Sequence, residues 1–271
     1  MKNSFDICSR CIMDTSDAQI SFDANGRCEY CNNYDLKIKP YWENNIKNKE
    51  YFFDLANHIR EKGKNKEFDC IIGLSGGLDS SYCAHFVKEK MGLRPLLFHV
   101  DAGWNTDQAV GNIEKLVDGL GLDLYTKVAN WDSVKRMQVA FLQSGIPDQD
   151  LIQDAVFFSE LYRFARKHKI EHVMTGSNFS TECCREPESW GGYLGIDRAF
   201  FNSIWKEHGD GKTNNFFLID ILVYKLWYQK ILGMQVVHPL NFINYIKKDA
   251  EHELQQLYGW QPFQHKHHES R

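Results

Sequence analysis

Residues 70–86, CIIGLSGGLDSSYCAHF, constrain the fold of this chain more than any other stretch. The apolar run that opens it is typical of a strand buried on both faces, as in parallel sheets. Gly76 and Gly77 allow a sharp turn with bare backbone N–H groups, and Asp79 and Ser80 are typical of a helix start. Unpaired N–H groups and the helix dipole meet at such a junction, so the stretch predicts an anion-binding site.

The rest of the chain alternates between strand-like and helix-like segments. Strands are expected at residues 94–100, 122–128 and 170–174, and helices at residues 105–120, 133–143 and 151–168. This order predicts an α/β fold with a parallel, Rossmann-like sheet, whose ligands bind beyond the carboxyl ends of the strands. The residues that follow the second and fourth strands are therefore site candidates: Val100, Asp101, Gly176, Ser177 and Asn178.

The loop after the first strand reads S-G-G-x-D-S at residues 75–80. It has neither the G-x-x-x-x-G-K-S/T pattern of a Walker A loop nor the G-x-G-x-x-G pattern of dinucleotide binders. The string resembles the PP-loop of the ATP pyrophosphatase superfamily, which has the adenine nucleotide α-hydrolase-like fold and cleaves ATP between its α and β phosphates. The resemblance implies that this loop holds the β,γ-phosphates and Mg²⁺. The residues that would bind them are Ser75, Gly76, Gly77, Asp79 and Ser80, and Asp79 and Ser75 would also be catalytic.

The same resemblance places the adenosine of ATP at the strand ends. In PP-loop proteins, backbone after the second strand pairs with adenine, which corresponds to Val100 and Asp101 here. A glycine after the fourth strand lies beside the ribose and the α-phosphate, which corresponds to Gly176, with Ser177 and Asn178 next to it.

Four of the eight cysteines form two C-x-x-C pairs near the N-terminus, Cys8 with Cys11 and Cys28 with Cys31. Two such pairs complete a tetrahedral S4 shell that suits a structural zinc ion, and a hairpin turn at residues 23–26 would bring them together. A redox C-x-x-C is the alternative, but two copies outside a βαβ unit favour metal. Four protein ligands leave no open position, so we expect the zinc to stabilise the fold and to take no part in chemistry.

These features predict three parts of the chain. Residues 1–35 are expected to form the zinc-binding module, residues 36–66 a polar helical linker, and residues 67–271 the PP-loop domain. A length of 271 residues accommodates one medium-sized α/β domain with such an appendage.

The composition of the chain predicts where in the cell the protein is found. No run approaches 18 apolar residues and the N-terminus lacks the apolar core of a signal peptide, so we expect a cytoplasmic protein with reduced cysteines and no membrane association. The net charge of −4 provides no general basic surface, which makes nucleic acid an unlikely partner.

Several further strings narrow the family. The chain opens with CSRCIMDTSD, continues through HVDAGWNTDQAV and ESWGG, and closes with HPLNFINYIKKDAEHELQQLYGW and KHHESR. Together they resemble the N-acetyl sugar amidotransferase family of surface-polysaccharide (lipopolysaccharide and O-antigen) biosynthesis. Two departures are visible: Phe263, Gln264 and His265 stand where members usually have glycines, and members usually continue for about a hundred residues beyond this point. We therefore expect a PP-loop domain that is shortened at its C-terminus relative to the family.

The family resemblance implies an ATP-dependent ligase that converts the acetamido group of a nucleotide-linked sugar to acetamidino through an imidate-like adenylate, releasing AMP and pyrophosphate. It also implies ammonia from a separate glutaminase subunit with a cyclase-like partner, because no glutaminase segment is visible in the chain. Lys266, in the polar run that ends the chain, is the family-based candidate for a catalytic contact with phosphate or sugar nucleotide.

Two other functions stay open at this level. A tRNA thiolase of the PP-loop type also joins zinc cysteines to such a loop, and Cys183 or Cys184 would then be its nucleophile. Glu182 and Glu186 flank the pair and oppose a thiolate, which favours incidental cysteines. A catalytically inactive binding module is the third class.

Overall fold

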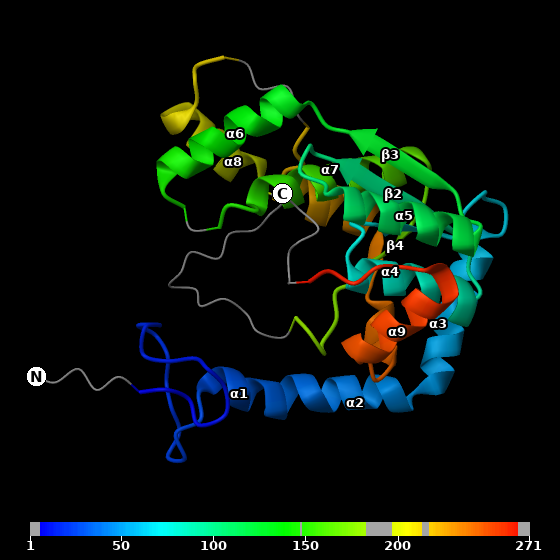
Figure 1. Cartoon of the computed structure of the whole chain (residues 1–271), viewed down its shortest axis with the longest axis horizontal. Coiled ribbons are helices and arrows are strands. Elements are labelled where there is room, and N and C mark those ends of the chain that lie inside the picture. The colour runs from blue at the N-terminus through cyan, green and yellow to red at the C-terminus, as the bar shows by residue number, and fades with distance from the viewer. Residues whose placement is uncertain (1–5, 147, 183–196, 213–216, 265–271) are drawn as a thin grey trace, which may run out of the picture.

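The core of the protein is a five-stranded, fully parallel sheet. The computed structural model describes residues 6–146, 148–182, 197–212 and 217–264 (Figure 1). In order across the sheet the strands are β3 (Leu124–Val128), β2 (Pro95–Asp101), β1 (Cys70–Gly73), β4 (His172–Met174) and β5 (Gln235–Val237). The predicted α/β class with a parallel sheet is confirmed.

Helices connect and cover the strands. The α-helices are α1 (Glu29–Asn33), α2 (Lys39–Lys47), α3 (Lys49–Gly63), α4 (Leu78–His85), α5 (Asp107–Leu120), α6 (Trp131–Ser144), α7 (Leu151–Lys167), α8 (Arg198–His208) and α9 (Lys247–Tyr258). The π- and 3-10-helical segments are η1 (Tyr34–Ile38), η2 (Phe86–Lys90), η4 (Val223–Ile231) and η5 (Pro239–Phe242). Among the described residues no helix is both long and apolar enough to cross a membrane.

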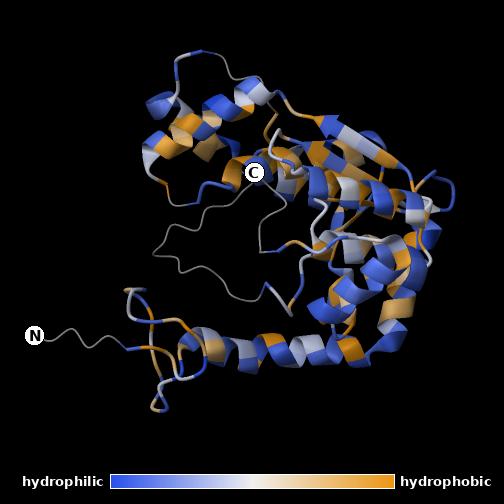
Figure 2. Cartoon of the chain, viewed as in Figure 1, coloured by the Kyte–Doolittle hydropathy of each residue, from blue (hydrophilic) through white to orange (hydrophobic). Residues whose placement is uncertain are grey.

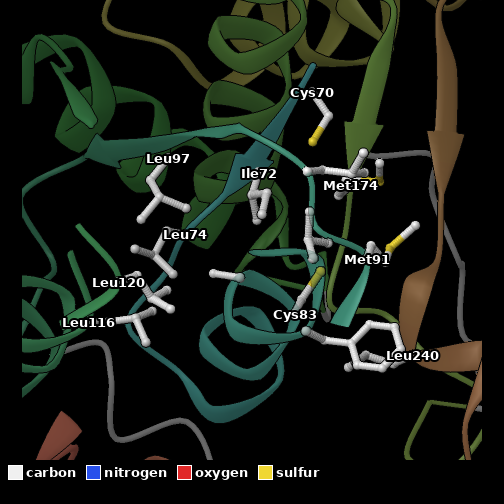
Figure 3. Packing of buried hydrophobic residues seen from close by; sticks show 14 of the residues in the cluster. Cys70, Ile72, Leu74, Cys83, Met91, Leu97, Leu116, Leu120, Met174 and Leu240 are labelled. Atoms are coloured by element: carbon white, nitrogen blue, oxygen red, sulfur yellow. The ribbon is translucent and has the colours of Figure 1, made fainter. Parts of the chain in front are cut away.

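Both faces of strand β1 are buried, as its apolar run predicts. Ile71 points into a core shared with α6, α7, α8 and η4, whereas Cys70 and Ile72 point into the core shared with α3, α4, α5 and α9. Figure 3 shows the second core, where Cys83 of α4 lies close to the sheet. Cys70 and Cys83 are fully buried in this core, where they act as packing residues.

The N-terminal part of the chain lies outside these layers. Segments α1, η1 and α2 run on from one another as a rod, with the cysteine-bearing loops at its far end (Figure 1). The linker expected at 36–66 breaks at Asn48, whose backbone leaves the helical region between α2 and α3. The rod is held to the domain by the Trp42 indole, which donates a hydrogen bond to the carbonyl of Ile243 at 3.1 Å.

Five described elements of the second half were not predicted: α8, η4, the edge strand β5, η5 and α9. Strand β5 has only three residues and extends the sheet beyond β4. Hydropathy alternates around the helices that cover the sheet, with apolar stripes between polar ones (Figure 2). Strand β5 is too short, and η4 too irregular, for such a periodic pattern to be recognised in the sequence.

Candidate functional site

The loop between β1 and α4 is shaped by two serine hydroxyls. Ser75 Oγ and Ser80 Oγ lie 3.0 Å apart, and Ser80 Oγ accepts the Ser75 N–H at 3.3 Å. Gly77 joins them, because its N–H donates to Ser75 Oγ and its carbonyl accepts from Ser80 Oγ. The loop therefore holds a fixed shape directly before the N-terminus of α4, where the first helical N–H groups lack intrahelical partners.

The sheet topology places this loop at the usual ligand position of an open α/β sheet. Strand β1 pairs with β2 on one side and β4 on the other, so the strand order reverses at β1. Ligands bind at such a point, beyond the carboxyl ends of the strands. The predicted anion-binding loop and the predicted strand-end residues thus lie at one edge of the sheet.

Two glycines allow close backbone approach at this edge. Gly76 has a φ of +85°, and a Cβ on it would lie 2.6 Å from the carbonyl oxygen of Ala109 in α5. A Cβ on Gly176, which follows β4, would lie 2.5 Å from the carbonyl carbon of Asp79 and 2.7 Å from the nitrogen of Ser80. Gly176 therefore packs directly on the first turn of α4, and only glycine fits without movement.

The carboxylate of Asp79 is held by two residues from the C-terminal part of the chain. The Tyr245 hydroxyl donates to Asp79 Oδ1 at 2.5 Å, and Lys247 Nζ lies 3.3 Å from Asp79 Oδ2. Burial, together with the adjacent Asp79 carboxylate, raises the pKa of Tyr245 far above its ordinary value, so this hydroxyl stays a donor. Sequence reasoning missed both residues, because 166 positions separate Tyr245 from Asp79.

The candidate residues after β2 are part of a hydrogen-bonded chain. Asp101 Oδ1 accepts from the Gly103 N–H at 2.8 Å and from Asn105 Nδ2 at 3.2 Å. Asn105 Nδ2 also lies 2.9 Å from Nε2 of His99, whose Nδ1 is 2.8 Å from the carbonyl of Leu74. The Leu74 carbonyl can only accept, so Nδ1 carries the proton and Nε2 accepts from Asn105. This chain of hydrogen bonds links the end of β2 to Leu74, directly before the loop at residues 75–80.

The side chains after β4 make their hydrogen bonds largely within their own loop. Asn178 Oδ1 accepts from the Ser180 and Thr181 backbone N–H groups, each at 3.0 Å, and its Nδ2 donates to the Gly176 carbonyl. Ser177 Oγ lies 3.2 Å from Nδ1 of His238, the residue after β5. Asn178 therefore holds Gly176 in place from a buried position. Val100, also a candidate, is buried at the end of β2.

A cavity of about 750 Å³ lies beside this site, between the α2–α3 junction, η2 and the start of α9. Six of its sixteen lining residues are aromatic, and Tyr82, Phe86 and Tyr245 are among them. Tyr245 belongs to both places, because its ring lines the cavity and its hydroxyl reaches Asp79.

The four N-terminal cysteines come together as the spacing predicts. The Sγ atoms of Cys8, Cys11, Cys28 and Cys31 all lie within 4.8 Å of one another. A hairpin brings the pairs together, since Gly26 N–H donates to the Asp23 carbonyl and Phe22 bridges to Cys28.

Their spacing suits a single metal ion. A tetrahedral ion with metal–sulfur bonds near 2.3 Å requires sulfurs about 3.8 Å apart, and the Cys11–Cys28 pair is at 3.6 Å. An iron–sulfur cluster would hold its cysteine sulfurs farther apart, because several irons lie between them. Burial opposes ionisation of Cys8, but backbone N–H donors, including those of Cys28 and Arg10, outweigh it and lower its pKa to about 6. The thiolate is the form that binds metal.

Three sequence candidates, Lys266, Cys183 and Cys184, lie outside the described residues. The expected roles of these three residues stay predictions.

No family model matches the chain. An uncharacterised protein of Methanocaldococcus jannaschii is 26% identical over 170 residues, which cover 62% of this chain. The match spans 58% of that relative, less than two thirds of its length.

Solved structures similar to the chain include two synthetases and a thiolase. An NH3-dependent NAD synthetase from Campylobacter jejuni has a TM-score of 0.37 and 20% identity, with 79% of this chain and 83% of that chain covered. An NMN synthetase from Francisella tularensis also has a TM-score of 0.37 and 20% identity, with 80% and 88% covered. A U34-tRNA thiolase from Methanococcus maripaludis, solved with its 4Fe–4S cluster, has a TM-score of 0.40 and 13% identity, with 95% and 74% covered. Such low TM-scores decide neither substrate nor cofactor.

Proposed function

We propose that this protein is an ATP-using enzyme of the PP-loop type that converts the acetamido group of a nucleotide-linked N-acetyl sugar to acetamidino. The S-G-G-x-D-S loop, closed by Ser75 and Ser80 and placed at the point where strand order reverses, supports the use of ATP. The strings CSRCIMDTSD, ESWGG and KHHESR support the sugar substrate, because they resemble the N-acetyl sugar amidotransferase family. Helix N–H groups, a carboxylate and a nearby ammonium at one sheet edge suit a polyphosphate with its cation.

Each residue of the loop has a role in this reading. The backbone of Gly76 and Gly77 approaches the β,γ-phosphates, the serine hydroxyls fix the loop, and Asp79 supplies the carboxylate for Mg²⁺. Lys247 lies close enough to exchange its contact with Asp79 for one with phosphate when the cation is bound. Gly176, held by Asn178, packs on the first turn of α4 and so fixes the position of this helix N-terminus relative to the α-phosphate. Catalysis here is mainly positioning and charge stabilisation.

The chemistry balances without an oxidant or reductant. The amide oxygen attacks the α-phosphorus, and pyrophosphate leaves with the electrons of the broken P–O bond. Ammonia then adds to the activated carbon, and AMP leaves with the former amide oxygen. The product has NH in place of O. In this proposal ammonia comes from a separate glutaminase subunit with a cyclase-like partner, and the four cysteines hold a structural zinc ion.

The alternative is a PP-loop tRNA thiolase, because the sequence joins the same loop to four N-terminal cysteines and also contains Cys183 and Cys184. It predicts salt-sensitive tRNA binding and loss of activity in Cys183→Ala or Cys184→Ala. The net charge of −4 favours the sugar substrate.

One assay separates the two functions. The protein is incubated with ATP, Mg²⁺, ammonium and a panel of nucleotide-linked N-acetyl sugars, or with tRNA and a sulfide donor, and AMP and product masses are measured. The proposal expects a sugar product one mass unit lighter, and ¹⁸O from a labelled acetamido group in the released AMP. Label that stays in the sugar, or turnover with tRNA alone, would refute it.

The loop assignment has its own test. Asp79→Asn keeps an acceptor for the Tyr245 hydroxyl but removes the charge, so AMP release should fall at least 100-fold while the fold is retained. Asp118→Asn, at an exposed position of α5, is the matched control and should keep full activity. Near-normal turnover of Asp79→Asn would mean that the loop does not bind Mg²⁺ and pyrophosphate.

A further inference from the structure

The two oxygens of the Asp79 carboxylate have partners of very different character. Oδ1 accepts a hydrogen bond of 2.5 Å from the hydroxyl of Tyr245, which is only 2% exposed. Oδ2 lies 3.3 Å from Lys247 Nζ, and the side chain of Lys247 is 42% exposed. An exposed ammonium on a flexible stem gives up such a contact at little cost, whereas a buried hydroxyl does not.

Tyr245 is itself fixed from two directions. Its ring packs on the ring of Tyr82 in α4, with the ring centres 5.5 Å apart. Its backbone carbonyl accepts a hydrogen bond of 2.8 Å from the hydroxyl of Ser180, in the loop that follows β4. The raised pKa of Tyr245 keeps its hydroxyl protonated. Asp79 Oδ1 therefore faces a hydrogen-bond donor at a fixed position.

We propose that Tyr245 is a positioning residue that leaves only Oδ2 of Asp79 for the divalent cation of ATP and thereby favours Mg²⁺ over Ca²⁺. The proposal rests on the proposed function in one respect, namely that the loop at residues 75–80 binds ATP with such a cation. The residues fit a cation of this kind, because Oδ2 is a hard oxygen donor and already lies against the positive charge of Lys247.

The preference for Mg²⁺ follows from how the two ions use carboxylates. Ca²⁺ takes more oxygen ligands in a flexible geometry and can bind both oxygens of one carboxylate, whereas Mg²⁺ requires near-ideal octahedral geometry. The Asp79 carboxylate cannot turn to offer both oxygens without breaking its buried hydrogen bond to Tyr245. A carboxylate held in this way offers one well-placed oxygen, which suits Mg²⁺ and disfavours Ca²⁺.

Binding of an ATP analogue with a methylene bridge between its α and β phosphorus atoms tests the proposal without turnover. Its dissociation constant is measured by calorimetry in EDTA, in Mg²⁺ and in Ca²⁺. In wild type, Mg²⁺ should tighten binding more than Ca²⁺ does. Tyr245→Phe keeps the ring and removes the hydroxyl, so the tightening by Mg²⁺ should fall about 10–100-fold, as is usual when a metal ligand loses its hydrogen bond. The dissociation constants of this variant in EDTA and in Ca²⁺ should stay close to those of wild type.

Tyr82→Phe is the matched control. It removes a hydroxyl from the neighbouring ring, and that hydroxyl also donates to a carboxylate, Glu253 Oε2, at 2.8 Å. Glu253 belongs to α9 and not to the loop at residues 75–80, so all three dissociation constants should equal those of wild type. Circular dichroism verifies that both variants are folded. The comparison of Mg²⁺ with Ca²⁺ in wild type needs no variant, so it tests the proposal even if Tyr245→Phe fails to fold.

Three results would overturn the proposal and leave the proposed function standing. Equal tightening by Mg²⁺ and Ca²⁺ in wild type would exclude the selectivity, and an unchanged Mg²⁺ effect in Tyr245→Phe would exclude the role of the hydroxyl. An equal loss of affinity in EDTA, Mg²⁺ and Ca²⁺ would mean that Tyr245 has a structural role alone. If wild type binds the analogue under none of these conditions, the proposed function fails together with this proposal.

Discussion

Replacing Gly176 by alanine tests the contact between the loop after β4 and the first turn of α4. The new Cβ would lie 2.5 Å from the carbonyl carbon of Asp79, whereas ordinary contact begins at 3.4 Å. The two backbones must therefore separate by about 0.9 Å, which is the difference between these distances. No flexible side chain can yield instead, because the three nearest atoms all belong to backbone.

The displacement has two expected consequences. Overpacking of this kind costs about 1–3 kcal/mol of unfolding free energy, which corresponds to a fall in Tm of roughly 2–12 °C for a domain of this size. A shift of about 1 Å in a positioned site costs roughly 100-fold in turnover. We therefore expect Gly176→Ala to stay folded at 25 °C and to lose most of its AMP release.

Gly111→Ala is the matched control. A Cβ at Gly111 in α5 meets no atom within 4 Å, so alanine should stabilise the helix by about 0.5–1 kcal/mol and leave turnover unchanged. Differential scanning fluorimetry and AMP release are measured for both variants. If Gly176→Ala matched wild type in both, the close approach of the two loops would have no role in the site.

The remaining predictions concern the metal site and acid stability. Cys28→Ser should lower the bound metal and Tm and make residues 1–35 protease-sensitive, whereas folded molecules should keep their rate of AMP release; a stable but inactive variant would contradict this. Arg136 lowers the pKa of Asp210 to about 2. Stability from this pair is therefore present above the ordinary carboxyl pKa and lost as pH falls toward 2, so the Tm deficit of Asp210→Asn should be seen at pH 6 and shrink below pH 4. A deficit independent of pH would exclude the ion pair as its cause.

Local patterns predicted the parts of this fold that depend on neighbouring residues. The geometry of two features is determined by residues only a few positions apart. These features are the strand, glycine turn and helix start at residues 70–86, and the two C-x-x-C pairs. The turn at residues 23–26 is of the same kind, and the structure places Cys28 next to Cys8 through it.

The partners of Asp79 could not be predicted in this way. Tyr245 and Lys247 reach it only after the whole sheet has formed, and neither belongs to a motif that marks a phosphate site. Asn178 illustrates a different limit, because its residue type suits both a ligand contact and a loop turn. Only the structure reveals that its amide holds Gly176 and the following loop.

Strand β1 lies at the centre of the finished sheet between β2 and β4. Of these two neighbours, β4 is synthesised much later than β2. Strand β4 begins about a hundred residues after β1 ends, whereas β2 and β3 follow β1 closely. At roughly 5–20 residues per second, the ribosome takes about 5–20 s to cover that distance.

During this interval a nascent chain with β1, β2 and β3 has β1 at its edge. The backbone groups of Ile71 and Ile72 that later pair with β4 are then open to any other extended chain. Emergence of β4 ends that exposure and, at the same moment, brings Gly176 onto α4. The strand pairing that closes the open edge of β1 is therefore also the event that brings Gly176 onto the first turn of α4.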